Sequence, residues 1–233
     1  MLFRSEDVLG TVDLPPEDRG ERLRPLFDYL YDQVREHVEH PRDDLTTHLI
    51  NAELYGQKLG PEHVVGTIVL LLIAGIDTTW SAIGASLWHL AGHRADRERL
   101  VASPDALSTA MEEFLRAYAP VTMARLVKED THFGDVDMKA EDWILLSFPA
   151  ANRDPAHFDQ ADQVVIDREV NRHAAFGLGI HRCLGSHLAR MELRVALEVW
   201  LSRIPEFTLA DPSAVTWSSG QIRGPRALPL RIS

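Results

Sequence analysis

A long apolar segment at residues 63–90 places the strongest constraint on the fold of this chain. Pro61 precedes it, and proline is favoured in the first turn of a helix. The segment is apolar on almost every face, which is typical of a helix buried in a protein core. The polar residues Asp77, Thr78 and Thr79 interrupt it near the middle, where burial costs free energy unless they are hydrogen-bonded. Either the threonines bond to carbonyls one turn earlier and Asp77 forms a salt bridge, or this point is a functional site.

The only cysteine, Cys183, lies in a glycine-rich stretch at residues 176–185 that leads directly into an amphipathic run at 187–201. A single cysteine cannot close an internal disulfide. Gly177 and Gly179 allow a tight turn with positive φ and let a flat ligand approach the backbone. The sulfur is expected at a helix N-terminus, where amide groups and the helix dipole favour the thiolate, the form that ligates iron. The stretch therefore meets the electronic requirement of a haem-thiolate centre.

Two other interpretations of Cys183 are open at this point. Most free cysteines are small buried hydrophobes, and composition alone favours that interpretation. A zinc cluster of His181, Cys183 and His187 is the other, but it offers only three ligands within seven residues and lacks a second cysteine pair. It also leaves the glycines without a purpose.

Composition excludes several other classes of protein. With 233 residues, of which 45% are hydrophobic, the chain is long enough for one large or two small folded domains. Its net charge of −11 disfavours nucleic-acid binding, which needs a clustered basic face. Residues 1–20 lack the basic start and apolar block of a signal peptide, and the longest apolar run, 68–76, is short of the roughly 18 residues of a membrane span. We expect a soluble protein of the reducing cytoplasm, without membrane attachment.

The remaining periodicity predicts a mainly α fold with a small β component. Helical spacing of apolar residues predicts helices at 22–40, 45–54, 103–116 and 187–201. Residues 2–19 read as a connection, with Pro15, Pro16 and Gly20 as breakers. Alternating and β-branched residues predict a small sheet at 121–126, 136–138 and 143–146, with a turn near Gly134.

The pattern F-G-x-G-x-H-x-C-x-G at residues 176–185 resembles the haem-binding loop of the cytochrome P450 family, of the bacterial soluble type. The resemblance implies that Cys183 is the proximal ligand of the haem iron. It also implies that the loop is shaped around the haem by Phe176, Gly177, Gly179 and Gly185.

Residues 74–79 read A-G-x-D-T-T and resemble the signature of the same family's long distal helix. By position, Thr78 is the hydroxyl and Asp77 the acid that relay protons during oxygen activation. Ala74 belongs, by the same resemblance, to the haem site. The two signatures follow the order and spacing of the family.

Glu113 and Arg116 match the E-x-x-R of the family, a buried ion pair with a structural role beneath the haem loop. The ordinary alternative is a surface pair worth well under about 1 kcal/mol. Arg153 and Arg168 are candidate third members of the network, and Arg168 is favoured.

Further positions match the haem edge and the substrate pocket. By resemblance, Arg125 and His181 pair with the haem propionates; a surface arginine and a loop-capping histidine are the ordinary alternatives. Val121 and Met123 face the substrate pocket, as does the late turn 218–222 between two short strands, although such residues are more often plain core. Around the cysteine, a positive patch able to steer an acidic electron donor is suggested by Arg182, Arg190 and Arg194, which are otherwise ordinary solvated arginines.

The resemblance implies a haem-thiolate monooxygenase that hydroxylates a small organic substrate with dioxygen. The cofactor is haem b (heme b, iron protoporphyrin IX), and electrons come from a separate ferredoxin or flavoprotein. Residues 1–233 are expected to form a single haem-binding C-terminal portion of the cytochrome P450 fold, truncated at the N-terminus so that N-terminal helices and the pocket roof are missing. Apolar faces that lose their cover are expected to weaken haem binding or folding. The alternative is a non-catalytic remnant that needs a missing N-terminal half.

Overall fold

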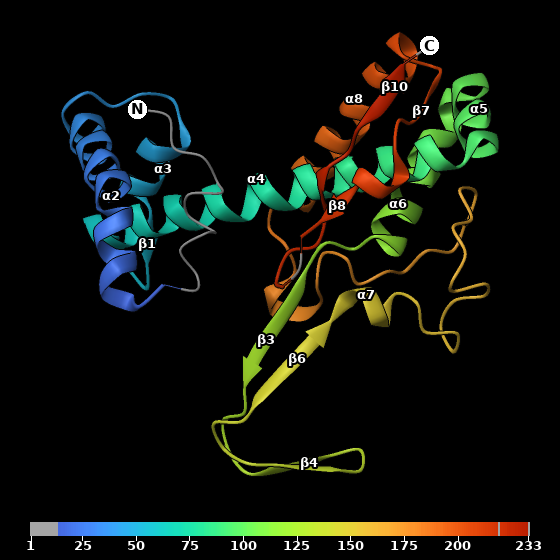
Figure 1. Ribbon diagram of the computed structural model, residues 1–233. Coiled ribbons are helices and arrows are strands. Elements are labelled where there is room, and N and C mark those ends of the chain that lie inside the picture. The colour runs from blue at the N-terminus through green and yellow to red at the C-terminus, as the bar shows by residue number, and fades with distance from the viewer. Residues whose placement is uncertain (1–13, 219, 233) are drawn as a thin grey trace. The chain divides into compact units, whose positions relative to one another are not determined.

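The computed structural model describes residues 14–218 and 220–232. These residues are mainly helical, with short two-stranded sheets (Figure 1). They fall into two compact units that divide between Asp77 and Thr78, inside helix α4. Each unit has its own hydrophobic core. The predicted fold class, mainly α with a small β component, is confirmed.

The N-terminal unit begins with α2 (Pro16–Glu39), which starts earlier than the sequence pattern predicted. Pro16 and Gly20 were expected to break helices, and that expectation is wrong. Proline lacks an amide hydrogen and has a fixed φ, so it suits the first position of a helix. The predicted connection at residues 2–19 is thus helical from Pro16, and its residues 2–13 lie outside the described part of the chain.

Helix α3 (Leu45–Asn51) follows and is shorter than predicted. Asp44 caps it, since its carboxylate accepts the amide of Thr47 at 2.9 Å. The helix ends before the hairpin of β1 (Glu53–Leu54) and β2 (Gln57–Lys58). Tyr55 and Gly56 form its two-residue turn, with φ values of 53° and 78°, the left-handed conformation that such tight hairpins require.

Helix α4 (Pro61–Gly92) contains the predicted apolar segment and extends it slightly at both ends. Its first part packs on α2 through Val64 and Val65, which share a core with Leu26, Leu30 and Val34. The expected burial on every side is not found, because Leu70, Leu71, Leu72 and Ile76 are exposed. By length and composition α4 is also able to cross a membrane, a test that the core helix of a soluble protein passes equally well.

The C-terminal unit is built around a helical core. The second part of α4 packs with α6 and α8, and the core includes Leu90, Phe114 and Leu197. Buried His89 ties the end of α4 to its neighbours, since its ring nitrogens lie 2.7 Å from both the Tyr118 hydroxyl and the Asp96 carboxylate. The helical elements that follow α4 are α5 (Arg94–Ala102), η1 (Pro104–Ala106), α6 (Leu107–Ala117), α7 (Phe148–Ala151), η2 (Gly179–His181), α8 (Ser186–Arg203) and η3 (Pro212–Ala214).

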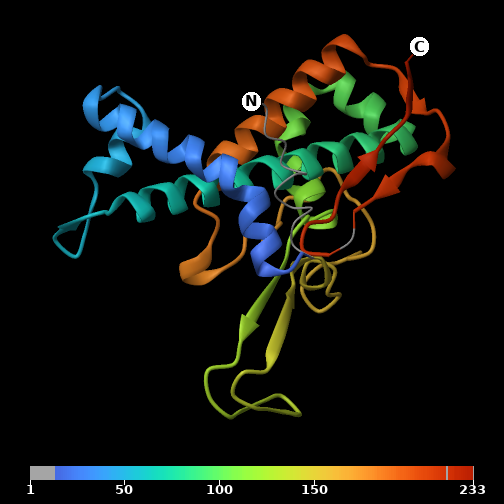
Figure 2. The ribbon, with the colours of Figure 1, turned by 60° about the vertical axis from the view of Figure 1, so that its left-hand side comes forward.

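The strands of this unit form antiparallel pairs. The longest pair, β3 with β6, extends away from the helices and carries the β4–β5 hairpin with its turn at Gly134 (Figures 1 and 2). The strands predicted at 121–126, 136–138 and 143–146 are thus found. The pairs are β3 (Thr122–Leu126) with β6 (Trp143–Ser147), β4 (Thr131–Phe133) with β5 (Val136–Met138), β7 (Phe207–Leu209) with β10 (Leu230–Ile232), and β8 (Thr216–Trp217) with β9 (Pro225–Ala227).

Candidate functional site

The cysteine lies on a loop whose backbone needs its glycines. Gly177 and Gly179 have φ values of 68° and 66°, which are strained for any residue with a Cβ. The amide of Cys183 donates to the carbonyl of Phe176 at 2.8 Å and closes the loop. Gly185 is the N-cap of α8, so the sulfur lies just before a helix N-terminus, as the sequence predicted.

The loop presents its thiol among apolar side chains that nothing covers in the described residues. Cys183 is exposed. Leu178, Ile180 and Leu184 are 72%, 97% and 89% exposed. Exposed apolar side chains in a group mark a binding surface, because water around them is costly. The interpretation of Cys183 as a buried hydrophobe is therefore wrong.

Glu113 and Arg116 of α6 form the centre of a buried network. Both side chains are fully buried, and two bonds of 2.8 Å join them. Arg116 also donates to the carbonyls of Asn152, Ala161 and Gln163 at 2.6 to 2.8 Å. These carbonyls belong to the irregular stretch after α7, so the pair holds that stretch against α6.

Arg168 is the third member of the network, as the sequence favoured. Its Nε lies 2.9 Å from Glu113. Arg153 instead donates to the carbonyls of Ala117 and Asp162. Burial opposes ionisation of Glu113, but hydrogen bonds from Arg116, the Val165 amide and Arg168 outweigh it and hold its pKa below the usual value.

Glu112, the neighbour of Glu113, faces a different set of partners. It accepts from Arg190 of α8 at 2.6 and 2.8 Å and lies 3.0 Å from His173. Burial opposes its ionisation, but the bonds to Arg190 and His173 lower the pKa of Glu112 from 4.5 to about 2. The adjacent carboxylates therefore tie α6 to α8 on one side and to the stretch after α7 on the other.

Arg125 and His181, the candidate propionate partners, differ from these arginines because no carboxylate of the described residues forms a pair with either of them. Arg125 on β3 donates to the Ala124 carbonyl, and no carboxylate of the described residues pairs with it. His181 lies exposed in η2 within the cysteine loop. A cationic side chain left without a carboxylate suits an anionic ligand group.

The distal residues lie on consecutive turns of α4. Asp77 is buried, with 1% exposure, and Thr78 is half-buried. Ala74 is exposed on the preceding turn. Ala74 and Asp77 belong to the N-terminal unit, and Thr78 and Cys183 belong to the C-terminal unit. Asp77 and Thr78 are thus adjacent residues of α4, and Asp77 is the more deeply buried of the two.

The candidate pocket residues come together at the start of β3. Val121 forms an isolated bridge with Ile222, and the Thr122 amide donates to the Gln221 carbonyl at 2.9 Å. Met123, also named from the sequence, follows on the same strand. Ser219 of the predicted turn lies outside the described residues. The start of β3 and the turn around Ile222, which are far apart in the sequence, thus lie side by side and form one wall.

The C-terminal turn also rests on α4 through small residues. A Cβ on Gly224 would lie 2.3 Å from the Cβ of Ser81, so only glycine fits there. Pro225 packs against Gly84 at 3.4 Å from its Cβ position. This contact fixes the turn against the helix that carries Thr78.

The donor chemistry of the loop fits haem better than zinc. In the described residues no group of three or more histidine, cysteine or acidic side chains is placed to hold a metal ion. His181, Cys183 and His187 therefore form no zinc cluster. A single exposed thiol, apolar neighbours and glycines with positive φ suit a flat apolar macrocycle with one axial sulfur ligand.

Three residues of this support were not identified from the sequence as parts of the site. Asn152, with 1% exposure, bonds to the Arg116 carbonyl and to the Ala174 amide. Glu112 and His173 are the other two. Neither spacing nor periodicity marks them, because their partners lie far away in the chain. Only the repeated acid at 112 and 113 hints that a second partner exists.

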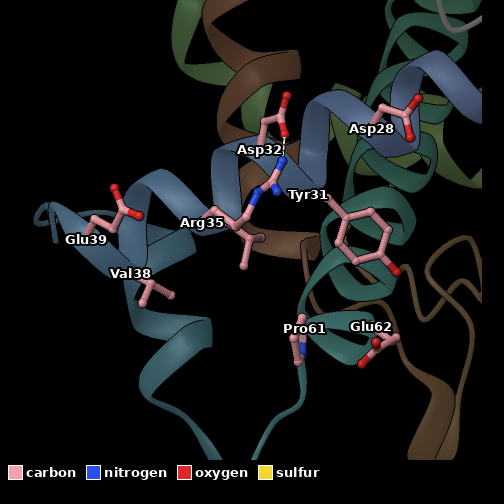
Figure 3. A pocket seen from close by; sticks show the side chains of 9 residues that line it. Asp28, Tyr31, Asp32, Arg35, Val38, Glu39, Pro61 and Glu62 are labelled. Atoms are coloured by element: carbon pink, nitrogen blue, oxygen red, sulfur yellow. Dashed lines mark hydrogen bonds and ion pairs between the residues drawn. The ribbon is translucent and has the colours of Figure 1, made fainter.

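The N-terminal unit contains a separate open pocket between α2 and the start of α4 (Figure 3). Its lining mixes acidic and apolar side chains, with Asp32 paired to Arg35 on α2 and Glu62 at the start of α4. It contains none of the residues that the sequence assigned to the haem site. Acidic side chains on a helix face are most often simply solvated.

Together, the fold and the loop define an α-rich protein with a single exposed thiol on a glycine-shaped loop. The sequence model of the cytochrome P450 family matches residues 20–210. The chain belongs to the cytochrome P450 family.

Relatives from bacteria support this assignment. The chain is 36% identical over 230 residues to the polyketide biosynthesis cytochrome P450 PksS of Bacillus subtilis, covering 97% of this chain and 57% of that protein. It is 37% identical to the steroid C26-monooxygenase of Mycolicibacterium smegmatis, covering 99% and 59%. The solved structure of PksS superposes with a TM-score of 0.92 over 98% of this chain and 60% of that one. The chain thus spans somewhat more than half the length of these relatives.

Proposed function

We propose that this chain is the haem-binding part of a cytochrome P450 monooxygenase, in which Cys183 is the axial ligand of the iron. The observation that carries the proposal is the exposed thiol on a glycine-shaped loop, surrounded by exposed Leu178, Ile180 and Leu184. When bound, haem b supplies the activation of dioxygen, with one oxygen atom entering a small organic substrate and the other leaving as water.

The chain's own residues bind and orient the cofactor. The thiolate of Cys183 donates electron density to the metal. Gly177 and Gly179, which have no side chain and adopt positive φ, would let the backbone approach a flat cofactor. Arg125 and His181 would hold the propionates, and Arg125 suits this task because no carboxylate of the described residues pairs with it.

Asp77 and Thr78 would serve as the proton donors of the reaction, as the resemblance of residues 74–79 to the family signature implies. The hydroxyl of Thr78 would deliver protons during oxygen activation, and Asp77, its buried neighbour in the sequence, would be the acid that renews them. Val121, Met123 and Ile222 form part of an apolar wall for the substrate. That wall excludes water from the reacting groups.

Electrons come from a separate ferredoxin or flavoprotein. This arrangement is what the resemblance to bacterial soluble cytochromes P450 implies. The basic patch that the sequence suggested for docking this donor is reduced, because Arg190 pairs with Glu112 and Arg194 with Glu198. We place the protein in the cytoplasm, as a soluble enzyme.

The test is a carbon monoxide difference spectrum of the reduced, haem-reconstituted chain. A thiolate-type Soret band is expected for the wild type and should be lost in Cys183→Ala. Persistence of the band in that variant would remove Cys183 as the ligand. Circular dichroism of both proteins controls for folding.

A second experiment tests the proton relay. In an active assembly, Thr78→Ala should divert reducing equivalents from product to hydrogen peroxide, because the hydroxyl no longer delivers protons. Thr78→Ser keeps the hydroxyl and should restore the coupling. Unchanged coupling in Thr78→Ala would exclude Thr78 from the relay.

One observation favours a second candidate, a non-catalytic module that binds haem only with additional polypeptide. The chain spans 57% of the length of PksS, and apolar residues of α4 and α8 such as Leu70 and Met191 are exposed. Such faces require cover in a stable haem protein. Failure of the folded chain to take up haem, with recovery when the missing portion of a relative is added, identifies this candidate.

A further inference from the structure

Arg190 and Glu112 form a two-pronged ion pair between α8 and α6. The Nε and Nη2 atoms of Arg190 lie 2.6 and 2.8 Å from the two carboxylate oxygens of Glu112. His173 approaches the same carboxylate at 3.0 Å. The side chains of Arg190, Glu112 and His173 are 27%, 29% and 3% exposed, so the pair is partly shielded from water. A planar guanidinium held at two points has little freedom to rotate.

The held guanidinium lies on the first residue of the cysteine loop. The Cζ atom of Arg190 is 4.5 Å from the ring centroid of Phe176, a cation–π contact. His173, the other partner of Glu112, also faces that ring, with centroids 6.1 Å apart. The carbonyl of Phe176 accepts the amide of Cys183 at 2.8 Å. One residue therefore connects the arginine plane to the backbone that presents the sulfur.

Electrostatics point in the same direction. The hydrogen bond to Glu112 raises the pKa of Arg190, burial works against this, and the negative charge of Cys183 adds to the rise. The ion pair with Glu112 and the ring contact with Phe176 place the guanidinium beside the cysteine loop. The ion pair with Glu112 fixes the position of the Arg190 guanidinium and leaves it little freedom to pair with another group.

Arg194, one turn further along α8, offers a matched contrast. It pairs with Glu198 of its own helix at 2.7 Å, and both side chains are largely exposed. No ring contact joins it to the cysteine loop among the described residues. The same residue type on the same helix thus makes an ion pair that cannot affect the loop.

We propose that Arg190 is a positioning residue for Cys183: held by Glu112 and His173, it fixes Phe176 and, through the backbone of that residue, the place of the sulfur. The role as a positioner of an iron ligand rests on the proposed function. The fixing of the loop does not depend on haem, because every contact in it lies within the chain.

The test uses amide hydrogen exchange on the haem-free chain. Arg190→Lys keeps the charge but loses the fork and the flat face, and it should speed exchange at the Cys183 amide about tenfold. The amide of Leu197, in the buried middle of α8, should keep its protection. Arg194→Lys should change neither amide.

Two results overturn the proposal. One is an unchanged exchange rate of the Cys183 amide in Arg190→Lys. The other is an equal loss of protection at the Cys183 and Leu197 amides, which would assign Arg190 to the general stability of α8. If Arg190→Lys does not fold, Phe176→Leu replaces it. That variant leaves the pair with Glu112 intact and should speed exchange at Cys183 by a similar factor.

A spectroscopic arm separates this proposal from the proposed function. In haem-reconstituted protein, Arg190→Lys should convert part of the thiolate-type carbon monoxide band to a form without sulfur ligation, and Arg194→Lys should not. Full retention of the band in Arg190→Lys contradicts the positioning role. Absence of haem uptake by the wild type, with the exchange result intact, contradicts the proposed function and leaves the fixing of the loop in place.

Discussion

The network around α6 and the outer surface of the cysteine loop and α8 are opposites within one unit. Around α6, Glu113 and Arg116 are fully buried, and every hydrogen-bonding group of the pair has a partner. On the loop and the outer face of α8, Ile180, Leu184 and Met191 are apolar and exposed. The ion pair of the first region finds all its hydrogen-bond partners within the chain. The apolar side chains of the second region are left uncovered by the described residues. The difference teaches that the chain itself supplies the polar support of the cysteine loop, whereas the apolar surroundings of the loop have no cover among the described residues.

The largest effect should come from breaking the buried pair. Arg116→Ala leaves Glu113 as a buried charge without its main partner, which typically costs about 3–5 kcal/mol of unfolding free energy. That is enough to unfold many domains. Urea unfolding followed by circular dichroism measures it. Arg99→Ala removes an exposed pair with Asp167 and should cost under about 1 kcal/mol. Equal costs for the two variants would show that the α6 network is no stronger than a surface pair.

Acid should weaken the support through Glu112. Its pKa is lowered from 4.5 to about 2 in the folded chain, so the stabilisation is fully present above pH 4.5 and is lost as the pH falls toward 2. At neutral pH the unfolding free energy of the wild type should exceed that of Glu112→Gln by up to about 3 kcal/mol. Unfolding midpoints of both proteins across this range test the difference. A gap that stays constant with pH would show that the charge of Glu112 is not responsible.

The cysteine loop should be sensitive at its glycines. Gly177 has φ of 68°, and alanine there costs roughly 1–2 kcal/mol of strain. Gly66, inside α4, has nothing within 4 Å of its Cβ position, so Gly66→Ala should stabilise the chain by about 0.5–1 kcal/mol. Thermal unfolding distinguishes the two. Stabilisation by Gly177→Ala would mean that the loop does not hold its positive φ.

The outer face of α8 should give the smallest effect. Leu188 is 53% exposed, so Leu188→Gln should change the unfolding free energy of the chain alone by under about 0.5 kcal/mol. Leu193 lies on the inner face, where Leu193→Ala should cost about 2–5 kcal/mol. A large loss in Leu188→Gln would show that this face is already covered in solution, by self-association for example. Sedimentation velocity reports that state.

Local patterns predicted much of this architecture. The apolar segment predicted α4, the spacing of Glu113 and Arg116 predicted a pair on one helix face, and Arg168 was favoured as its third member. Each depends on neighbours in sequence or on a motif. Gly20 was misjudged as a breaker, because a helix tolerates one glycine when its other residues pack.

The sequence did not predict which residues far apart in the chain would pair. Nothing in the residue types indicated that Glu112 would pair with Arg190 and His173. Nor did they indicate that Asn152 would join α6 to Ala174, just before the cysteine loop. Exposure was also only partly foreseen. Apolar periodicity shows which face of a helix avoids water, but burial depends on what packs there, and residues 70–76 of α4 lack that cover in the described chain.

The central claim is that the sulfur of Cys183 binds the haem iron, and iron X-ray absorption of the reconstituted chain tests it most directly. The account predicts one sulfur scatterer in the first coordination sphere of the wild type and its loss in Cys183→Ser. A coordination sphere of nitrogen and oxygen alone in the wild type, in protein that has bound haem, would contradict it.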